Sequence, residues 1–447
     1  MKKYFFQLAF LCFLIVVFNS CKPSLNVPKP STGTANFQKT IAVGGSYMAG
    51  YQDGALYASG QTNSLPAILA TQFKLVGGGN FVQPMMPDNN GLGLNIKSWQ
   101  GPFISKNTLG YVADCKGVTA LQPIINNLSA SAANPYLNSV QGTNFNNYGI
   151  PGATTADLLN LNLSLPFSTF NPNPFYTRFA TSIGASTVAA DAAAQHPTFF
   201  IAWLGMENIY NYAQNGGYKK TILSPAAFGE ELDSIIGTLA LGNTKGVIAT
   251  IPDFRDMPFF TTIPSQGVVL TQHLADSLNT STGNLFHFQA DSNGFVIEYP
   301  ANSGKYRKLS RAEYVLLDAP LDSMKCNMLG VLNPLPNRYV LDSSEIQIIE
   351  NAITSYNQVI QTKALQYNLA LVDMNAYFKT VKNGILDNGV SFNSALVTGG
   401  FFSLDGFCPC QKGYALIANQ FITAINQKYG AAIPPTNVNS YQGISFP

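Results

Sequence analysis

The chain has 447 residues, of which 46% are hydrophobic and only 11% are charged, with 25 Lys and Arg against 23 Asp and Glu. This length allows one large domain or two ordinary ones, each with a substantial core. An aromatic fraction of 12% excludes a largely disordered chain. A net charge of only +2 argues against nucleic-acid partners and against electrostatic binding to anionic lipid.

The first 20 residues have the parts of a secretory signal. Lys2 and Lys3 precede an apolar run over residues 4–18, which is shorter than the roughly 20 residues of a membrane span. Small residues then lead to Cys21. This arrangement resembles bacterial lipoprotein signals, in which the cysteine thiol receives a diacylglycerol and becomes the first mature residue. A plain signal peptide with an incidental cysteine is the alternative.

We therefore expect residues 1–20 to be removed and residues 21–36 to form a lipid anchor and a proline-spaced tether. Loss of Lys2 and Lys3 leaves 23 basic and 23 acidic residues. The anchor attaches the domain to a membrane of the cell envelope. No acidic run follows Cys21, which favours the periplasmic side of the outer membrane.

Short apolar runs rich in β-branched or aromatic residues indicate strands that are buried on both faces. They cover residues 40–43, 198–204, 247–251 and 369–372. Amphipathic helices are predicted between and after them. Buried strands that alternate with such helices predict an α/β fold with a parallel sheet.

Two of the helices have defined ends. Ser344 and Gln347 form a predicted capping box, which apolar residues follow at 3.6-residue spacing. Residues 412–429 form another amphipathic pattern that stops at Gly430. We expect one domain over residues 37–447, with a β-rich insertion at about 281–320.

Four cysteines remain once residues 1–20 are removed and Cys21 carries lipid: Cys115, Cys326, Cys408 and Cys410. Outside the cytoplasm they can form disulfides, in any of three pairings. A zinc site is the rival interpretation, but the one close pair is spaced more tightly than zinc ligands usually are. We expect no metal and no cofactor.

A serine follows the first predicted strand and lies between small residues, since residues 44–50 read GGSYMAG. Sites of open parallel sheets lie at the strand ends, in the crevice where strand order reverses. Ser46 therefore has the uncrowded position that a nucleophile needs. A Gly-Gly-Ser sequence alone is also typical of a plain turn.

Further blocks follow in order: residues 147–153, NYGIPGA; residues 203–208, WLGMEN; and residues 403–409, SLDGFCP. Together with the serine block they resemble the SGNH, or GDSL-like, ester hydrolase family over essentially the whole mature chain. Residues 50–54 and 441–447 are similar to lipoprotein members of that family. The resemblance implies a three-layer α/β/α sandwich with a flavodoxin-like sheet.

The resemblance also implies roles for single residues. Ser46 would be the nucleophile and Asp405 the acid that orients the base. Gly152 would offer a backbone N–H to the oxyanion, alongside the N–H of Ser46. The implied ligand is a carbohydrate or lipid ester.

Two positions near the serine depart from the family pattern. Glu207 stands where the family has an Asn that binds the oxyanion, and an ionised carboxylate only accepts hydrogen bonds. The neighbouring Asn208 is the candidate to replace that donor. Gly45 stands where the family has Asp or Asn, which we expect mainly to loosen the turn.

Cys408 stands where the family has its catalytic histidine. A thiol with a pKa near about 8.5 does not shuttle a serine proton as an imidazole near about 6.5 does. The replacements available are His196, His273 and His287, of which His287 lies in the predicted insertion and could fold over the cleft. Alternatively, Cys408 is itself a nucleophile or forms a disulfide with Cys115 or Cys326.

Two hypotheses for function follow. The favoured one is a lipid-anchored envelope protein whose SGNH-like domain has impaired or absent hydrolysis, because Cys408 and Glu207 replace groups that act in the transition state. The alternative is an active serine esterase that uses Ser46 with a non-standard base.

Overall fold

The computed structural model describes residues 29–94, 103–128, 139–140, 144–165, 173–301 and 303–447. The predicted signal and Cys21 lie outside these residues. Within the described part of the chain, every helix is too short or too polar to cross a membrane.

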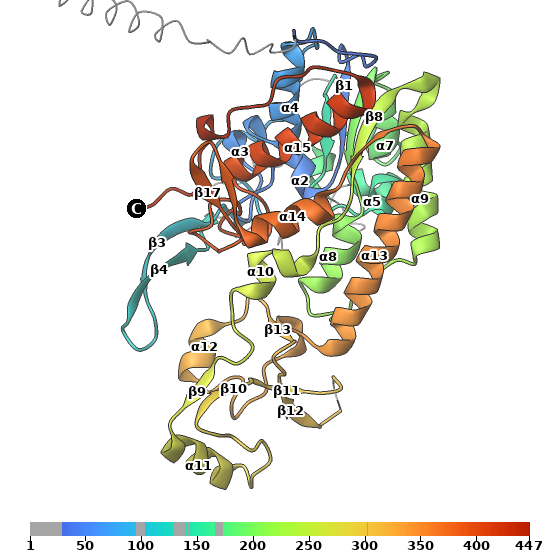
Figure 1. Ribbon diagram of the computed structural model, residues 1–447. Helices are drawn as coiled ribbons and strands as arrows, with labels where there is room; N and C mark the ends of the chain where they lie inside the picture. The colour runs from blue at the N-terminus through green and yellow to red at the C-terminus, as the bar shows by residue number, and fades with distance from the viewer. Residues whose placement is uncertain (1–28, 95–102, 129–138, 141–143, 166–172, 302) are drawn as a thin grey trace, which may run out of the picture.

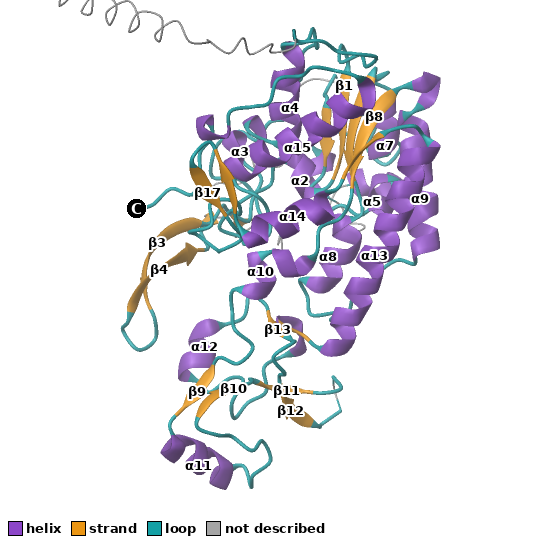
Figure 2. Ribbon diagram, in the orientation of Figure 1, coloured by secondary structure: helices purple, strands orange, loops and turns teal. Residues whose placement is uncertain are grey.

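Five parallel strands form the central sheet (Figure 2). They are β1 (Thr40–Gly44), β6 (Asn147–Gly149), β7 (Phe199–Trp203), β8 (Lys245–Ala249) and β15 (Ala370–Val372). Their order across the sheet is β6-β1-β7-β8-β15, and all neighbours are parallel. In chain order this is 2-1-3-4-5, the flavodoxin-like arrangement. The predicted parallel sheet is confirmed.

Helices cover both faces of this sheet (Figure 1). On one face α4 (Leu65–Lys74) packs on α15 (Gln411–Tyr429). On the other face α9 (Pro225–Leu239) packs on both α7 (Val188–Ala193) and α13 (Ser343–Gln366). The expected three-layer sandwich is therefore confirmed. Shorter helices at its edges are α2 (Ser46–Ala49), α3 (Ala58–Thr62), α5 (Thr155–Leu158), α6 (Pro174–Thr177), α8 (Met206–Ala213), α10 (Pro258–Thr261) and α14 (Met374–Asn383).

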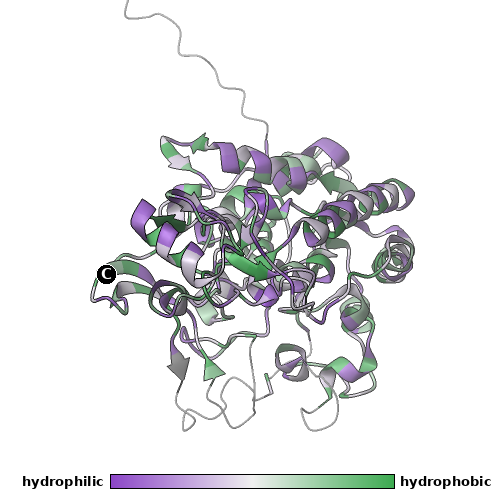
Figure 3. Ribbon diagram, turned by 90° about the horizontal axis from the view of Figure 1, so that it is seen from below, coloured by the Kyte–Doolittle hydropathy of each residue, from purple (hydrophilic) through white to green (hydrophobic). Residues whose placement is uncertain are grey.

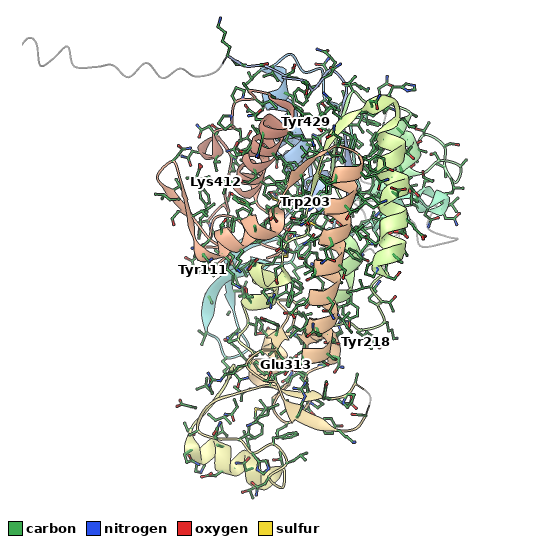
Figure 4. All side chains as sticks on the ribbon, turned by 45° about the vertical axis from the view of Figure 1, so that its right-hand side comes forward. Tyr111, Trp203, Tyr218, Glu313, Lys412 and Tyr429 are labelled. Atoms are coloured by element: carbon green, nitrogen blue, oxygen red, sulfur yellow. A yellow bond between two sulfur atoms is a disulfide. The ribbon has the colours of Figure 1, made fainter. Side chains whose placement is uncertain are left out.

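The core forms because the central strands are apolar on both sides. Every residue of β1 and β7 is buried. Trp203, labelled in Figure 4, lies inside the sandwich, where its indole N–H donates to the Thr250 carbonyl and its ring meets Tyr47 edge-on. The surrounding helices alternate between apolar and polar segments (Figure 3), as expected for helices that bury one stripe.

The start of α13 differs from the prediction. Its N-cap is Asp342, whose carboxylate accepts the N–H groups of Ser344 and Glu345, while the Glu345 carboxylate accepts the N–H of Asp342. The predicted capping box of Ser344 and Gln347 is wrong because Ser344 is already inside the first turn, where its hydroxyl donates to Asp342. The helix end predicted at Gly430 is confirmed, with φ 63.

A second, smaller core lies between β8 and α13 in the chain, and Figure 1 shows it below the sandwich. Its elements are β9 (Val268–Leu270), α11 (Gln272–Ser281), β10 (Asp291–Asn293), β11 (Val296–Glu298), β12 (Tyr306–Lys308), β13 (Tyr314–Val315), α12 (Leu321–Cys326) and β14 (Val340–Leu341). The antiparallel pairs confirm that the insertion is β-rich. It extends beyond residues 281–320 because β9 pairs with β10 and β14 pairs with β13.

A hairpin of β3 (Thr108–Ala113) and β4 (Thr119–Ile124) reaches toward this insertion (Figure 1). Cys115 in its turn forms a disulfide with Cys326 at the end of α12. Beside it, Lys325 and Asp114 form an ion pair at 2.8 Å. The remaining antiparallel pairs are β2 (Phe103–Ile104) with β5 (Asn127–Leu128), and β16 (Ile385–Asp387) with β17 (Val390–Phe392).

This pairing decides between the alternatives for the cysteines. Cys408 and Cys410 are free and buried. The interpretation in which Cys408 is bonded to Cys115 or Cys326 is wrong, because those two cysteines are bonded to each other.

Candidate active site

The site is built where the sheet changes its strand order. The ends of β1 and β7 lie side by side, with Gly44 paired to Trp203, and this is the crevice that binds ligands in flavodoxin-like sheets. Ser46 begins the short helix after β1. Gly205, at φ 91, turns the chain after β7 into α8 and places Glu207 in its first turn.

A cavity of about 770 Å³ opens over these strand ends. All the residues singled out from the sequence motifs border it: Ser46, Gly152, Glu207, Asn208, Asp405 and Cys408. Its walls also include residues of the hairpin region and of the insertion, such as Asn107, Asp318 and Arg338. The structure thus brings the motif residues together, while their catalytic roles stay predictions.

Ser46 is buried, with 4% of its surface exposed. Its Oγ accepts the N–H of Gly152 at 3.0 Å, and its own N–H donates to Glu207 Oε1 at 2.6 Å. The Ser46 side chain also lies close enough to the Glu207 carboxylate to lower its pKa. A carboxylate therefore already occupies the Ser46 N–H that was expected to bind the oxyanion.

Burial raises the pKa of Glu207 to about 6. The hydrogen bonds from Ser46 oppose this rise, and the charge of Asp157 adds to it. Near neutral pH the carboxylate is therefore ionised, and it carries its charge at the place where an ester carbonyl would develop one.

Gly45 makes room for this carboxylate. A Cβ built at position 45 would lie 2.0 Å from Glu207 Oε1. The backbone of Gly45 has φ −96 and ψ −142, so it is not in the left-handed region. The expectation that Gly45 mainly loosens the turn is therefore not what the structure shows, because the space is filled by the Glu207 carboxyl group.

Asn208 also borders the cavity but uses its amide elsewhere. Its side-chain oxygen accepts the N–H of Thr155 at 3.0 Å, and its Nδ2 donates to Thr155 Oγ1 at 2.9 Å. The amide donor that was to replace the missing oxyanion ligand is thus committed to α5.

Asp405 holds the turn that carries Cys408. Its carboxylate accepts the N–H groups of Phe407 at 2.8 Å, Cys408 at 2.7 Å and Gly54 at 3.1 Å. Burial nevertheless raises the pKa of Asp405 to about 6. The three bonds fix the loop after β1 to the turn before α15.

Cys408 has the wrong chemistry for a base or a thiolate nucleophile. Its side chain is 1% exposed, and burial raises the pKa of its thiol well above the usual range. The charges of Asp405 and Glu207 add to this rise. The proton stays on sulfur at neutral pH.

The three histidines of the chain are exposed, and none borders the cavity. His196 precedes β7 at the opposite edge of the sheet. His273 lies on α11, and His287 lies in the insertion between the buried rings of Phe286 and Phe288. The alternative in which His287 folds over the cleft is therefore wrong.

Sequence reasoning missed Asp53 as a supporting residue. Its carboxylate accepts the Tyr57 hydroxyl at 2.7 Å and the Leu404 N–H at 2.9 Å, and its own N–H donates to Ser403 Oγ at 2.8 Å. Asp53 thus ties the loop after β1 to the turn of Asp405. Asp53 lies within residues 50–54, a segment that was noted in the sequence only for its similarity to lipoprotein members of the family. That similarity did not indicate a supporting role for Asp53.

Comparison with protein-family models and with curated proteins finds no match for this chain. Solved structures with a similar fold include a protein from Parabacteroides merdae described as a GDSL-like lipase, with 10% identity and a TM-score of 0.35 over 89% of this chain and 99% of its own. An acetyl-xylooligosaccharide esterase from Geobacillus has 11% identity and a TM-score of 0.36, over 88% of this chain and 95% of its own.

A lipase/acylhydrolase from Enterococcus faecalis has 13% identity and a TM-score of 0.34, over 90% of this chain and 99% of its own. The strand order and the two helical layers show the fold: a flavodoxin-like α/β/α sandwich with a β-rich insertion.

Proposed function

We propose that this chain is a lipid-anchored protein of the cell envelope with an SGNH/GDSL-like ester hydrolase domain whose hydrolysis is impaired. Support for the domain comes from the four motif blocks, which meet in one cavity with Ser46 at the crevice of the sheet. Cys21 is the proposed lipid attachment site, and the periplasmic side of the outer membrane is the proposed location.

The impairment rests on one observation: no imidazole borders the cavity, and the residue at the place of the base is a buried thiol beside Asp405. Ester hydrolysis by a serine needs a group that takes the hydroxyl proton during attack. Removing such a base has cost up to about a millionfold in rate in a protease. The Glu207 carboxylate on the Ser46 N–H adds a second obstacle.

The alternative of an active serine esterase has a specific observation in its favour. The Glu207 carboxylate accepts the Ser46 N–H and has a pKa of about 6 that the Ser46 side chain lowers, so it lies beside the hydroxyl that has to lose its proton. The same carboxylate would repel the negative charge that forms on the ester oxygen. Impaired hydrolysis is therefore the better-supported function.

The ligand we propose is an ester-bearing carbohydrate or lipid. The cavity walls offer amide and phenol groups that suit a hydroxyl-rich molecule: Asn107, Asn211, Tyr212, Gln214 and Asn215. A pocket of about 770 Å³ is of the size that holds small ligands.

The test is hydrolysis of p-nitrophenyl acetate and of acetylated sugars by the full chain. We expect the wild type to be no faster than Ser46→Ala, and the double variant Glu207→Asn with Cys408→His to gain turnover that Ser46→Ala abolishes. Wild-type turnover that depends on Ser46 would overturn the impairment. In that case loss of activity in Glu207→Gln, together with a pH profile that rises near 6, would identify Glu207 as the base.

A further inference from the structure

The carboxyl group of Glu207 lies in the space that a side chain at position 45 would take. The three atoms nearest to a Cβ built on Gly45 are Oε1, Cδ and Oε2 of Glu207, all within 2.2 Å. Every heavy atom that such a Cβ meets first therefore belongs to one carboxyl group, although the two residues come from different strand ends.

Gly45 has φ −96 and ψ −142, so it does not lie in the left-handed region, whereas the nearby Gly50 has φ 82 and does. The Glu207 carboxyl group is the feature that a larger residue there would displace.

Hydrogen-bond donors, rather than cations, hold this carboxylate. It accepts the N–H of Ser46 at 2.6 Å, and its own backbone N–H and the Ser46 side chain lower its pKa. None of the ion pairs among the described residues involves Glu207. The ionisable groups that act on it are Asp157 on α5 and Cys408 on the turn before α15. The same cavity is also bordered by Asp405 and Asp318 and by the cations Lys220 and Arg338.

We propose that the donors around Ser46 form an anion-binding site that the protein fills with its own Glu207 carboxylate, and that Gly45 is the residue that admits this carboxylate. The ligand class of the site is a small carboxylate, which enters when the side chain at position 207 is shortened. The inference rests on the proposed function only in placing Ser46 at the site. Its tests measure thermal stability, so they can fail without any change in the hydrolysis result.

The first test compares Gly45→Ala in the wild type and in Glu207→Ala. We expect it to lower the Tm of the wild type by several degrees and that of Glu207→Ala by less than half as much, since residues in contact are not additive. Gly246→Ala is the control, because its Cβ would meet the Phe200 ring at 2.6 Å, away from Glu207. It should cost the same in both backgrounds.

Equal costs of Gly45→Ala in the two backgrounds would overturn the proposal. Glu207→Asp keeps the test available if Glu207→Ala does not fold. Its carboxylate is drawn back by one methylene group, so Gly45→Ala should cost less than half of its effect in the wild type. A cost as large as in the wild type would also overturn the proposal.

The second test is rescue by acetate. Glu207→Ala removes a CH2–COO⁻ group, which has the size of acetate, and leaves the Ser46 N–H without that acceptor. Acetate at 0.1 M should raise the Tm of this variant by about 1 °C over chloride at equal ionic strength and pH 7, and leave the wild type unchanged. Asp157→Ala is the matched control, since it also removes a cavity carboxylate but one that does not contact Ser46. The same response in all three proteins would contradict the proposal.

Discussion

Two buried glutamates, one in the insertion and one in the cavity, show opposite electrostatics. Glu313, labelled in Figure 4 near the start of α13, accepts two hydrogen bonds of 2.7 Å from Arg307, and its pKa is lowered to about 2 although burial acts against this. Glu207 has no cation, and burial raises its pKa to about 6. Both carboxylates also accept backbone N–H bonds.

The difference shows that the hydrogen-bond partner of a buried carboxylate decides whether its pKa is raised or lowered. Neutral N–H donors satisfy the oxygen atoms of Glu207 but do not repay its desolvation, whereas the guanidinium of Arg307 does so for Glu313. The ion pair belongs to the scaffold that joins the insertion to α13, because Glu313 also accepts from Ser343. The carboxylate without a cation belongs to the cavity. Perturbed pKa values are common at functional sites.

The largest expected effect comes from making Glu313 resemble Glu207. Arg307→Met leaves the carboxylate buried without a cation, so we expect a loss of about 3 kcal/mol in the free energy of unfolding at pH 7. Urea denaturation measures it, with Arg307→Lys as the control that keeps the charge and loses less. A loss below about 0.5 kcal/mol would show that the pair is only a surface ion pair.

A smaller effect comes from removing the charge of Glu207. Its folded pKa of about 6 lies above the value of 4.5 for the unfolded chain, so its contribution is fully present below pH 4.5 and is lost as pH rises through 6. We expect the stability of Glu207→Gln relative to the wild type to rise by roughly 2 kcal/mol between pH 4 and pH 8. The quantity to follow is the urea midpoint at each pH.

For Glu313→Gln we expect a change in stability relative to the wild type of the opposite sign. Its folded pKa of about 2 lies below 4.5, so the stabilisation is present above pH 4.5 and is lost as pH falls toward 2. This variant should lose stability relative to the wild type at pH 7, and the deficit should shrink as the medium becomes acidic. Parallel pH profiles for the two glutamine variants would abolish the contrast between the regions.

The smallest effect is expected from Ser46→Ala. The hydroxyl is one of the donors that lower the pKa of Glu207, while the stronger backbone N–H bond is retained. We expect Ser46→Ala to change the free energy of unfolding at pH 7 by less than about 1 kcal/mol. When Glu207→Gln is compared with its parent in the Ser46→Ala background, the rise in its relative stability should occur at higher pH than in the wild-type background. No shift of that rise would mean that the hydroxyl does not contribute to the field at Glu207.

Much of the sandwich could be predicted from the sequence because its signals are local. Runs such as residues 198–204 are apolar and rich enough in aromatic and β-branched residues to identify strands, and Gly430 ends the last helix as expected. The convergence of Ser46 and Glu207, which follow β1 and β7, is expected from a general property of parallel sheets, whose carboxyl strand ends meet at one edge.

The rest could not be predicted because it depends on pairs that are distant in the chain. Gly45 and Glu207 look like two separate departures in the sequence, and only the sheet places the carboxyl group of one in the space of the other. Asp342 and Ser344 were both suitable N-cap residues for α13, and the structure has Asp342 in that position. The disulfide joins residues separated by 211 positions, for which spacing offers no rule.

That disulfide determines under which conditions two walls of the cavity become covalently joined. Asn107, next to the hairpin, and Asp318, in the insertion, border one cavity, and the Cys115–Cys326 bond fastens their two segments together. Such bonds persist in oxidising surroundings. The chamber above Ser46 therefore gains its covalent brace only in oxidising surroundings, and a chain in a reducing compartment would keep its two walls unjoined.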